Sequence, residues 1–184
     1  MNISIQPTPN PNALKFILEM DVKEDGKTSF KNPNQAKEIP LAASLFDLRG
    51  VDQIHFFKNV ITVSKFTFEP WDSLEPSIMT TIENMIEDHD PNFKDHDPEV
   101  ERRKNLPEDF LKIEEILDRR IRPGLQGDGG DLKAISFKEK ILIVQYQGAC
   151  GTCPSSTTGT LEAIRAILQE EYDPEIEVYI ASEM

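Results

Sequence analysis

The sequence predicts an α+β protein that is made of two small domains. Three observations support this prediction: strand-like runs occur in both halves, helical spacing of apolar residues alternates with them, and a charged, proline-containing stretch divides the chain. We expect an N-terminal antiparallel sheet with two helices over residues 1–88, followed by an acidic linker over 89–105. Residues 106–184 are expected to form an α-β-β-α-β domain, in which a three-stranded sheet carries two helices.

The composition is that of an acidic protein. The 184 residues include 33 Asp and Glu against 20 Lys and Arg, a formal net charge of −13. Nucleic-acid binding needs a cluster of lysine and arginine, and none stands out, so we expect no nucleic-acid partner. We also expect no membrane span, because no apolar run approaches the ~20 residues that one requires. Without a signal sequence or a spread-out set of cysteines, the protein is expected to be cytoplasmic.

Strand signals come first in the N-terminal half. Isoleucines alternate with polar residues at the start of the chain, and residues 14–18 resume the pattern after a proline-rich interruption. Phe30 is expected in a short edge strand. Two further β-rich runs, at 51–56 and 60–64, are close enough in sequence to form a hairpin. His55 lies in that hairpin, and we expect it to be packed or hydrogen-bonded rather than to bind a metal.

Two helices and a linker complete this half. Residues 40–48 are expected to form a helix that ends at Gly50, and 71–88 show apolar residues at helical spacing. The stretch 87–99 contains Asp-His-Asp-Pro twice. Turn-forming Asp-Pro pairs are typical of a solvated linker, which is the interpretation that we favour. A metal site is the alternative, because histidine and aspartate both bind divalent ions.

The C-terminal half is expected to begin with a helix over 106–122. Acidic residues in its first turn and arginines in its last turn suit the helix dipole. Pro123-Gly124 should stop this helix, and the glycine-rich stretch 127–131 is expected to be a tight turn into the next strand, with close approach of a ligand as the alternative. The remaining elements are strands at 132–137, 141–147 and 176–180, and a helix that begins near Pro154.

The chain's only two cysteines, Cys150 and Cys153, stand between a strand and a helix start. Helix N-termini favour thiolates, so at least one thiol should have a pKa below its usual value. A zinc ion or an iron–sulfur cluster takes about four protein ligands, so one chain supplies half a site and a second copy on a two-fold axis would complete it. The spacing leaves three alternatives open: a redox dithiol, a zinc-bridged dimer and a buried structural pair.

Two stretches carry a family resemblance. IRPGLQGDGGDL at 121–132 and GACGTCPSS at 148–156 together resemble the Nfu family, named after the C-terminal domain of NifU. The resemblance implies an iron–sulfur cluster scaffold or carrier in which Cys150 and Cys153 bind a cluster, usually [4Fe–4S], between two subunits. Thr152 replaces a glycine that many members have, but both sulfurs remain.

The opening of the chain extends this resemblance. Residues 5–16 resemble the N-terminal domain of Nfu proteins, and the segment has no cysteine, so a delivery or partner-recognition role is expected for it. The family implies a carrier rather than an enzyme, with apo iron–sulfur proteins as clients, the cluster-assembly machinery as donor, and a homodimer on cluster binding. We further expect the cysteine loop to be an exposed edge loop, where client thiolates can displace those of the carrier one at a time.

Overall fold

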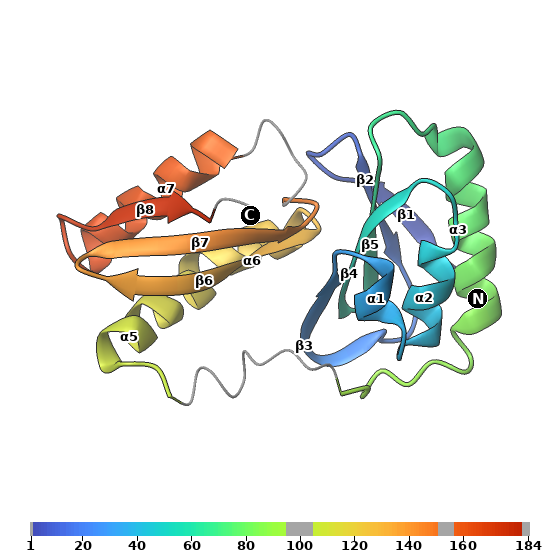
Figure 1. Cartoon of the computed structure of the whole chain (residues 1–184), viewed down its shortest axis with the longest axis horizontal. Helices are drawn as coiled ribbons and strands as arrows, with labels where there is room; N and C mark the ends of the chain where they lie inside the picture. Colours follow the sequence, from blue (N-terminus) through green and yellow to red (C-terminus); the bar gives the residue numbers. More distant parts are fainter. Residues whose placement is uncertain (1, 95–104, 151–156, 182–184) are drawn as a thin grey trace.

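The computed structural model describes residues 2–94, 105–150 and 157–181 (Figure 1). They form two lobes, which we call the N-terminal lobe (2–94) and the C-terminal lobe (105–181), each with its own sheet and its own hydrophobic cluster. The predicted α+β class with two sheets is therefore confirmed. Among the described residues, no helix is both long enough and apolar enough to cross a lipid bilayer.

The N-terminal lobe is a five-stranded antiparallel sheet with helices on one face. The strand order is β1-β2-β5-β4-β3, with an edge strand, β3, that is longer than the short strand predicted at Phe30. The strands are β1 Ser4–Pro7, β2 Ala13–Ile17, β3 Lys23–Phe30, β4 Val51–Lys58 and β5 Val60–Lys65. The predicted hairpin is the β4-β5 pair, in which Phe57 lies opposite Val60.

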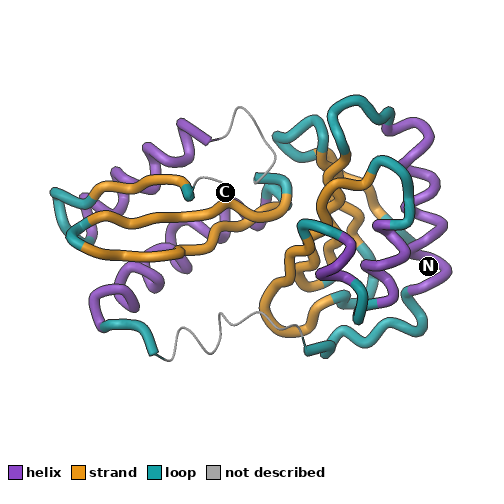
Figure 2. Tube along the Cα trace, viewed as in Figure 1, coloured by secondary structure: helices purple, strands orange, loops and turns teal. Residues whose placement is uncertain are grey.

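Three helices cover this sheet instead of the two predicted. They are α1 Pro33–Ala36, α2 Pro40–Phe46 and α3 Trp71–Met85. The sequence analysis missed α1 because four residues are too few to show helical spacing, although its N-cap, Asn32, accepts a hydrogen bond from the backbone N–H of Gln35. Figure 2 shows α2 and α3 on the side of the sheet that faces away from the C-terminal lobe.

Residues 89–94, which the sequence analysis assigned to the linker, pack on the N-terminal lobe. Phe93 belongs to its hydrophobic cluster, and a ring nitrogen of His89 lies 2.8 Å from the carbonyl oxygen of Val22. Lys23 donates a hydrogen bond to the Phe93 carbonyl at 3.0 Å. The aromatic ring of Phe93 explains the packing, because it offers apolar area to the core that the charged residues around it do not. The domain boundaries themselves stay a prediction.

The C-terminal lobe has the predicted order and a three-stranded sheet. The sheet order is β6-β7-β8, with β6 and β7 antiparallel and β7 and β8 parallel. The helices supply the apolar residues that pack with one face of the sheet into a single cluster. The elements are α5 Glu108–Ile116, η1 Leu117–Ile121, α6 Arg122–Gly127, β6 Gly130–Lys138, β7 Ile141–Gly148, α7 Thr157–Glu171 and β8 Glu177–Ile180.

The first helical segment of this lobe corrects one prediction. We expected Pro123-Gly124 to end the helix, but the chain stays helical through η1, a π-helical turn, and α6 as far as Gly127. Pro123 lies in the first turn of α6, where a residue without an N–H is tolerated. The wider π turn before it accommodates the change in hydrogen bonding. The glycines therefore lie at the end of the helix, next to the cysteine strand.

Candidate functional site

Cys150 follows the central strand of the C-terminal sheet. Strand β7 ends at Gly148, which has a positive φ of 60°, and the Ala149 N–H then donates a hydrogen bond to the Gly129 carbonyl at 3.1 Å. Cys150 itself is 8% exposed and joins the hydrophobic cluster of this lobe. Cys153 lies outside the described residues. The expectation of an exposed edge loop is thus wrong for Cys150, because the strand that leads to it is central and its side chain packs inward.

The predicted helix start near Pro154 lies outside the described residues. Helix α7 is described from Thr157 onward and carries the helical spacing that the sequence predicts. The lowered pKa expected for at least one thiol at a helix N-terminus stays a prediction.

The glycine-rich turn allows the backbone to lie against Cys150. A Cβ on Gly130 would overlap the Sγ of Cys150 and lie 2.8 Å from its backbone N. Gly129 has a φ of +80°, and a Cβ there would lie 2.9 Å from the side chain of Lys15. The prediction of a tight turn holds, and the close approach that the glycines permit is made by the protein's own residues.

A loop of the N-terminal lobe closes over the same place. Asn10, which is 1% exposed, donates a hydrogen bond from Nδ2 to the carbonyl oxygen of Ala149 at 2.9 Å. Two hydrogen bonds within the loop hold Asn10 in position for this contact. Its side-chain oxygen accepts from the Asn12 N–H at 2.9 Å, and its carbonyl accepts from the Thr8 hydroxyl at 2.9 Å. Asn10 therefore fixes the peptide bond that directly precedes Cys150.

Among the described residues, a small cavity lies beside Cys150. Its volume is about 30 Å³, and it is lined by Pro9 and Asn10 of the N-terminal lobe together with residues of the C-terminal lobe. A space of this size is comparable to the ~30 Å³ share of one water molecule in the liquid. This cavity is therefore too small for a multi-atom ligand.

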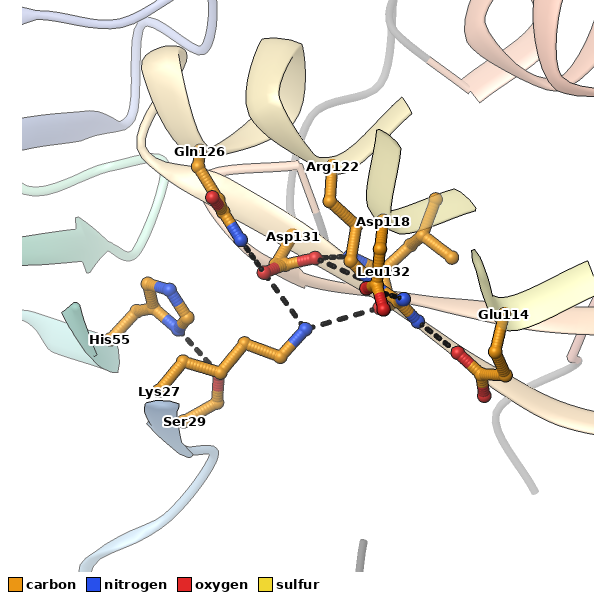
Figure 3. Close-up of polar contacts among 9 residues, drawn as sticks. All are labelled: Lys27, Ser29, His55, Glu114, Asp118, Arg122, Gln126, Asp131 and Leu132. Atoms are coloured by element: carbon orange, nitrogen blue, oxygen red, sulfur yellow. Dashed lines mark hydrogen bonds and ion pairs between the residues drawn. The ribbon is translucent and has the colours of Figure 1, made fainter. Parts of the chain in front are cut away.

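A buried carboxylate joins the two lobes a short way along the chain (Figure 3). Asp131, at the start of β6, has a fully buried side chain, and its Oδ2 lies 2.8 Å from the Nζ of Lys27 on β3. Gln126 donates to the same oxygen at 2.8 Å, and the Leu132 N–H donates to Oδ1 at 2.7 Å. Lys27 also donates to the Leu132 carbonyl at 3.2 Å. The N-terminal lobe therefore supplies the cation that a buried carboxylate requires.

Arg122 supports Asp131 from within the C-terminal lobe. Its side chain is 4% exposed, and Nε lies 3.6 Å from Asp131 Oδ1. The other guanidinium nitrogens pair with Glu114, at 2.7 Å, and with Asp118. Glu114 is also buried, so each buried charge in this network has a partner of opposite sign. Figure 3 shows the chain of contacts running from Lys27 through Asp131 to Glu114.

His55 packs at the interface between the lobes, as predicted for a structural histidine. Its Nδ1 lies 2.7 Å from the Ser29 hydroxyl, and a Cβ on Gly148 would lie 3.2 Å from its ring. Burial lowers the pKa of His55 to about 4, while Asp131 opposes this shift and Lys27 adds to it. Nε2 has no hydrogen-bond partner among the described residues. The ring is therefore neutral at physiological pH.

The metal site considered for the repeated Asp-His-Asp-Pro is not supported. Within 2–94, 105–150 and 157–181, no three His, Cys, Asp or Glu side chains come together as a metal site. In the first copy, the ring of His89 contacts a backbone carbonyl. The second copy begins at residue 95 and lies outside the described residues.

The sequence analysis missed the residues through which the N-terminal lobe reaches the site. Asn10 lies inside the stretch that resembles the N-terminal domain of Nfu proteins, and Asp131 lies inside the glycine-rich motif. The sequence predicted no contact for either residue. Neither Lys27, on β3, nor Lys15, which donates to the Gly127 carbonyl at 2.6 Å, stands out in the sequence. Contacts between lobes have no periodicity that a single sequence could display.

Comparison with known proteins places both lobes in one family. The family described as "Scaffold protein Nfu/NifU N terminal" matches residues 3–89, and the one described as "NifU-like domain" matches 113–179, which includes both cysteines. A human protein named "NFU1 iron-sulfur cluster scaffold homolog, mitochondrial" is 38% identical over 179 residues, which is 96% of this chain and 70% of that protein. The chain belongs to the Nfu family.

Other relatives of this Nfu protein are similar over the same range. The Drosophila sechellia protein of the same name is 35% identical over 180 residues, and these cover 96% of this chain. The chain spans 63% of the length of that relative. A solution NMR structure of a NifU-like protein from Saccharomyces cerevisiae has 24% sequence identity and a TM-score of 0.44, and covers 47% of this chain and 79% of that one.

Proposed function

We propose that this Nfu protein is an iron–sulfur cluster scaffold that carries a cluster and transfers it to apo-proteins. The observation that carries the proposal is the Cys-x-x-Cys pair directly after the central strand of the lobe that matches the NifU-like domain. Relatives named as iron–sulfur cluster scaffolds, similar over nearly the whole chain, support it. In this role the protein holds a cargo and catalyses no reaction.

The ligands in this proposal are Cys150 and Cys153 from each of two subunits. A cluster normally takes four thiolates, and the chain has two cysteines, so a homodimer on cluster binding gives the simplest complete set. The expected cargo is a [4Fe–4S] cluster. The donor is a cluster-assembly machine, and the clients are apo iron–sulfur proteins.

The small cavity beside Cys150 adds a conformational step to the proposal. A space of about 30 Å³, partly lined by Pro9 and Asn10, is too small for a cluster. We therefore propose that the loop that carries Asn10 leaves Ala149 before a second subunit shares the site. Thiolates need a reducing compartment. The expected cytoplasmic location stays a prediction, and the relatives named above are described as mitochondrial.

Anaerobic reconstitution tests the proposal. The full-length chain, supplied with iron, sulfide and a thiol reductant, should become brown, contain both elements and sediment as a dimer, whereas the untreated chain should sediment as a monomer. Cys150→Ala and Cys153→Ala should each abolish both the colour and the dimer. A colourless dimer with bound zinc, or a monomer that cycles between dithiol and disulfide, would contradict the proposal.

A further inference from the structure

A second, larger cavity lies between the two lobes. Its volume is about 580 Å³, and both lobes line it: β3, α1 and the residues after α1 on one side, and strands β6 and β7 on the other. We call it the interlobe cleft. A cleft of this size is within the range that binds small ligands or a few residues of a peptide. It is separate from the cavity beside Cys150, with which it shares no lining residue.

The interlobe cleft is basic although the protein is acidic. Among the described residues, four lysines line it, against a single carboxylate, that of Glu38. The lysines come from both lobes and are Lys31, Lys37, Lys94 and Lys133. In a chain with a net charge of −13, this local excess of positive charge creates a field opposite to that of the whole surface. The cleft therefore attracts an anionic ligand.

A buried amide in the cleft favours a ligand that donates a hydrogen bond as well as carrying negative charge. Gln147 lines the interlobe cleft from β7 and is 9% exposed, and its Oε1 has no hydrogen-bond partner among the described residues. A buried acceptor without a donor is unfavourable, so a ligand that supplies an N–H to this oxygen binds more tightly. The polar residues Thr28, Ser29 and Gln145 line the same cleft.

These features together select a class of ligand. Lysine ammonium groups donate hydrogen bonds and pair with carboxylates, whereas the Gln147 oxygen needs a donor. An inorganic anion supplies acceptors but no N–H, while an acidic peptide supplies side-chain carboxylates and backbone N–H groups at once. We propose that the interlobe cleft binds an acidic peptide segment of a partner protein.

The interlobe cleft lies close to the cysteine loop, so a peptide bound there would hold a client protein near the proposed cluster ligands. Gln147, near the end of β7, precedes Cys150 by three residues, so the two Cα atoms are at most roughly 10 Å apart along the chain. A client whose acidic segment occupies the cleft would have its own ligands beside the cysteine loop. Peptide binding is a property of the cluster-free chain, so this proposal stands whether or not the scaffold proposal does.

The experiment uses the full-length, cluster-free protein and a fluorescein-labelled eight-residue peptide in which glutamate and alanine alternate, followed by fluorescence anisotropy. The matched control peptide carries glutamine in place of glutamate. We expect the acidic peptide to bind and the control peptide not to bind. Raising the salt concentration should weaken the binding, because dissolved ions screen exposed charges. The screening length is about 10 Å at 0.1 M salt and shortens as salt is added.

Two triple variants with the same change in net charge locate the site. Lys37→Gln, Lys94→Gln and Lys133→Gln together should weaken binding at least about tenfold, since three charge pairs each contribute modestly. The control triple replaces three exposed lysines outside the cleft lining: Lys58→Gln, Lys112→Gln and Lys138→Gln. It should change the affinity less than about twofold, as expected for screened charges at a distance.

Gln147→Leu tests the amide, and should weaken peptide binding several-fold without changing the salt dependence. Equal losses in the two triple variants, or failure of the acidic peptide to bind, would overturn the proposal. Competition by inorganic phosphate or by an RNA oligonucleotide at lower concentration than the peptide would also overturn it, in favour of a general anion site. Failure of the wild-type chain to bind the acidic peptide, together with normal cluster loading, would refute this inference and leave the scaffold proposal standing.

Discussion

Lys27 on the edge strand of the N-terminal lobe places its Nζ 2.8 Å from the fully buried Oδ2 of Asp131 in the C-terminal lobe. The two residues belong to different sheets, and Asp131 lies one residue after Gly130, which packs against Cys150. Because a buried charge needs a counter-charge, the stability of the cysteine strand depends on the lobe that has no cysteine. The contacts of Lys15 and Asn10 reinforce the same dependence.

Lys27→Met should destabilise the chain and loosen the contact between the lobes. Asp131 keeps its hydrogen bonds from Gln126 and from the Leu132 N–H. We therefore expect the free energy of unfolding to fall by about 1–3 kcal/mol, less than for a buried charge that loses all its partners. Urea denaturation followed by the fluorescence of the single tryptophan and by circular dichroism measures this change.

Lys112→Met is the control for that measurement. Lys112 also pairs with carboxylates, those of Glu108 and Asp109, but all three side chains are exposed. Exposed pairs contribute little, so the denaturation midpoint should hardly move. Equal effects of the two substitutions would show that the contact between Lys27 and Asp131 is no stronger than a surface ion pair.

Asn10→Ala should make Cys150 more reactive toward alkylating reagents. The substitution removes the hydrogen bond to the Ala149 carbonyl and opens the small cavity beside the thiol. In a Cys153→Ser background the only thiol is Cys150, so the rate of iodoacetamide labelling reports its exposure directly. We expect an increase of about tenfold, corresponding to the loss of one buried hydrogen bond of about 1.4 kcal/mol.

Asn92→Ala serves as the matched control, since Asn92 is exposed and lies far along the chain from this loop. It should leave the labelling rate unchanged. If Asn10→Ala also left the rate unchanged, the loop would not be what limits access to Cys150, and the conformational step in the scaffold proposal would lose its basis.

The sequence predicted the features that depend on local periodicity. Both sheets, the β4-β5 hairpin, the order of the C-terminal elements and the packed role of His55 follow from alternation and helical spacing. The strands predicted at 132–137 and 141–147 are joined by a tight turn, with Glu139 and Lys140 at positive φ. The cysteines stood out because only two exist and they are three positions apart.

The errors came where tertiary packing overrides local signals. A proline in a helical pattern usually marks the end of the helix. Pro123 instead lies in the first turn of α6, directly after a π turn, so the helical segment continues through it. Burial of Cys150 depends on the central position of β7 and on Gly130, which no local pattern reveals. Asn10 and Lys27 act on residues more than one hundred positions away, and one sequence gives no measure of such pairing.

His55 should make the protein less stable as the pH falls below neutrality. Its pKa is lowered from 6.5 to about 4 in the folded chain, so between these values the unfolded chain binds a proton that the folded chain does not. Stability is therefore full above pH 6.5 and declines as the pH falls toward 4. At pH 5 the histidine should contribute about 2 kcal/mol of this decline.

His55→Gln isolates that contribution from the carboxylates. The difference in unfolding free energy between pH 7 and pH 5 should be about 2 kcal/mol smaller in the variant than in the wild type. Urea denaturation at both pH values measures it. Identical pH profiles for the two proteins would mean that the folded state does not suppress protonation of His55.

Gly130→Ala should damage the cysteine site. The new Cβ would overlap the Sγ of Cys150 and lie 2.8 Å from both the Cys150 N and the Gln147 carbonyl oxygen, so the strand end has to move. Overpacking of this kind costs about 1–3 kcal/mol. Because the displaced atom is the proposed ligand itself, the iron content after reconstitution should fall with the stability.

Gly159→Ala is the matched control: a Cβ there meets nothing within 4 Å, and in helix α7 alanine should stabilise the chain by about 0.5 kcal/mol and leave cluster loading intact. Normal loading of Gly130→Ala would show that the close packing of Gly130 on Cys150 is not needed to hold the ligand in place.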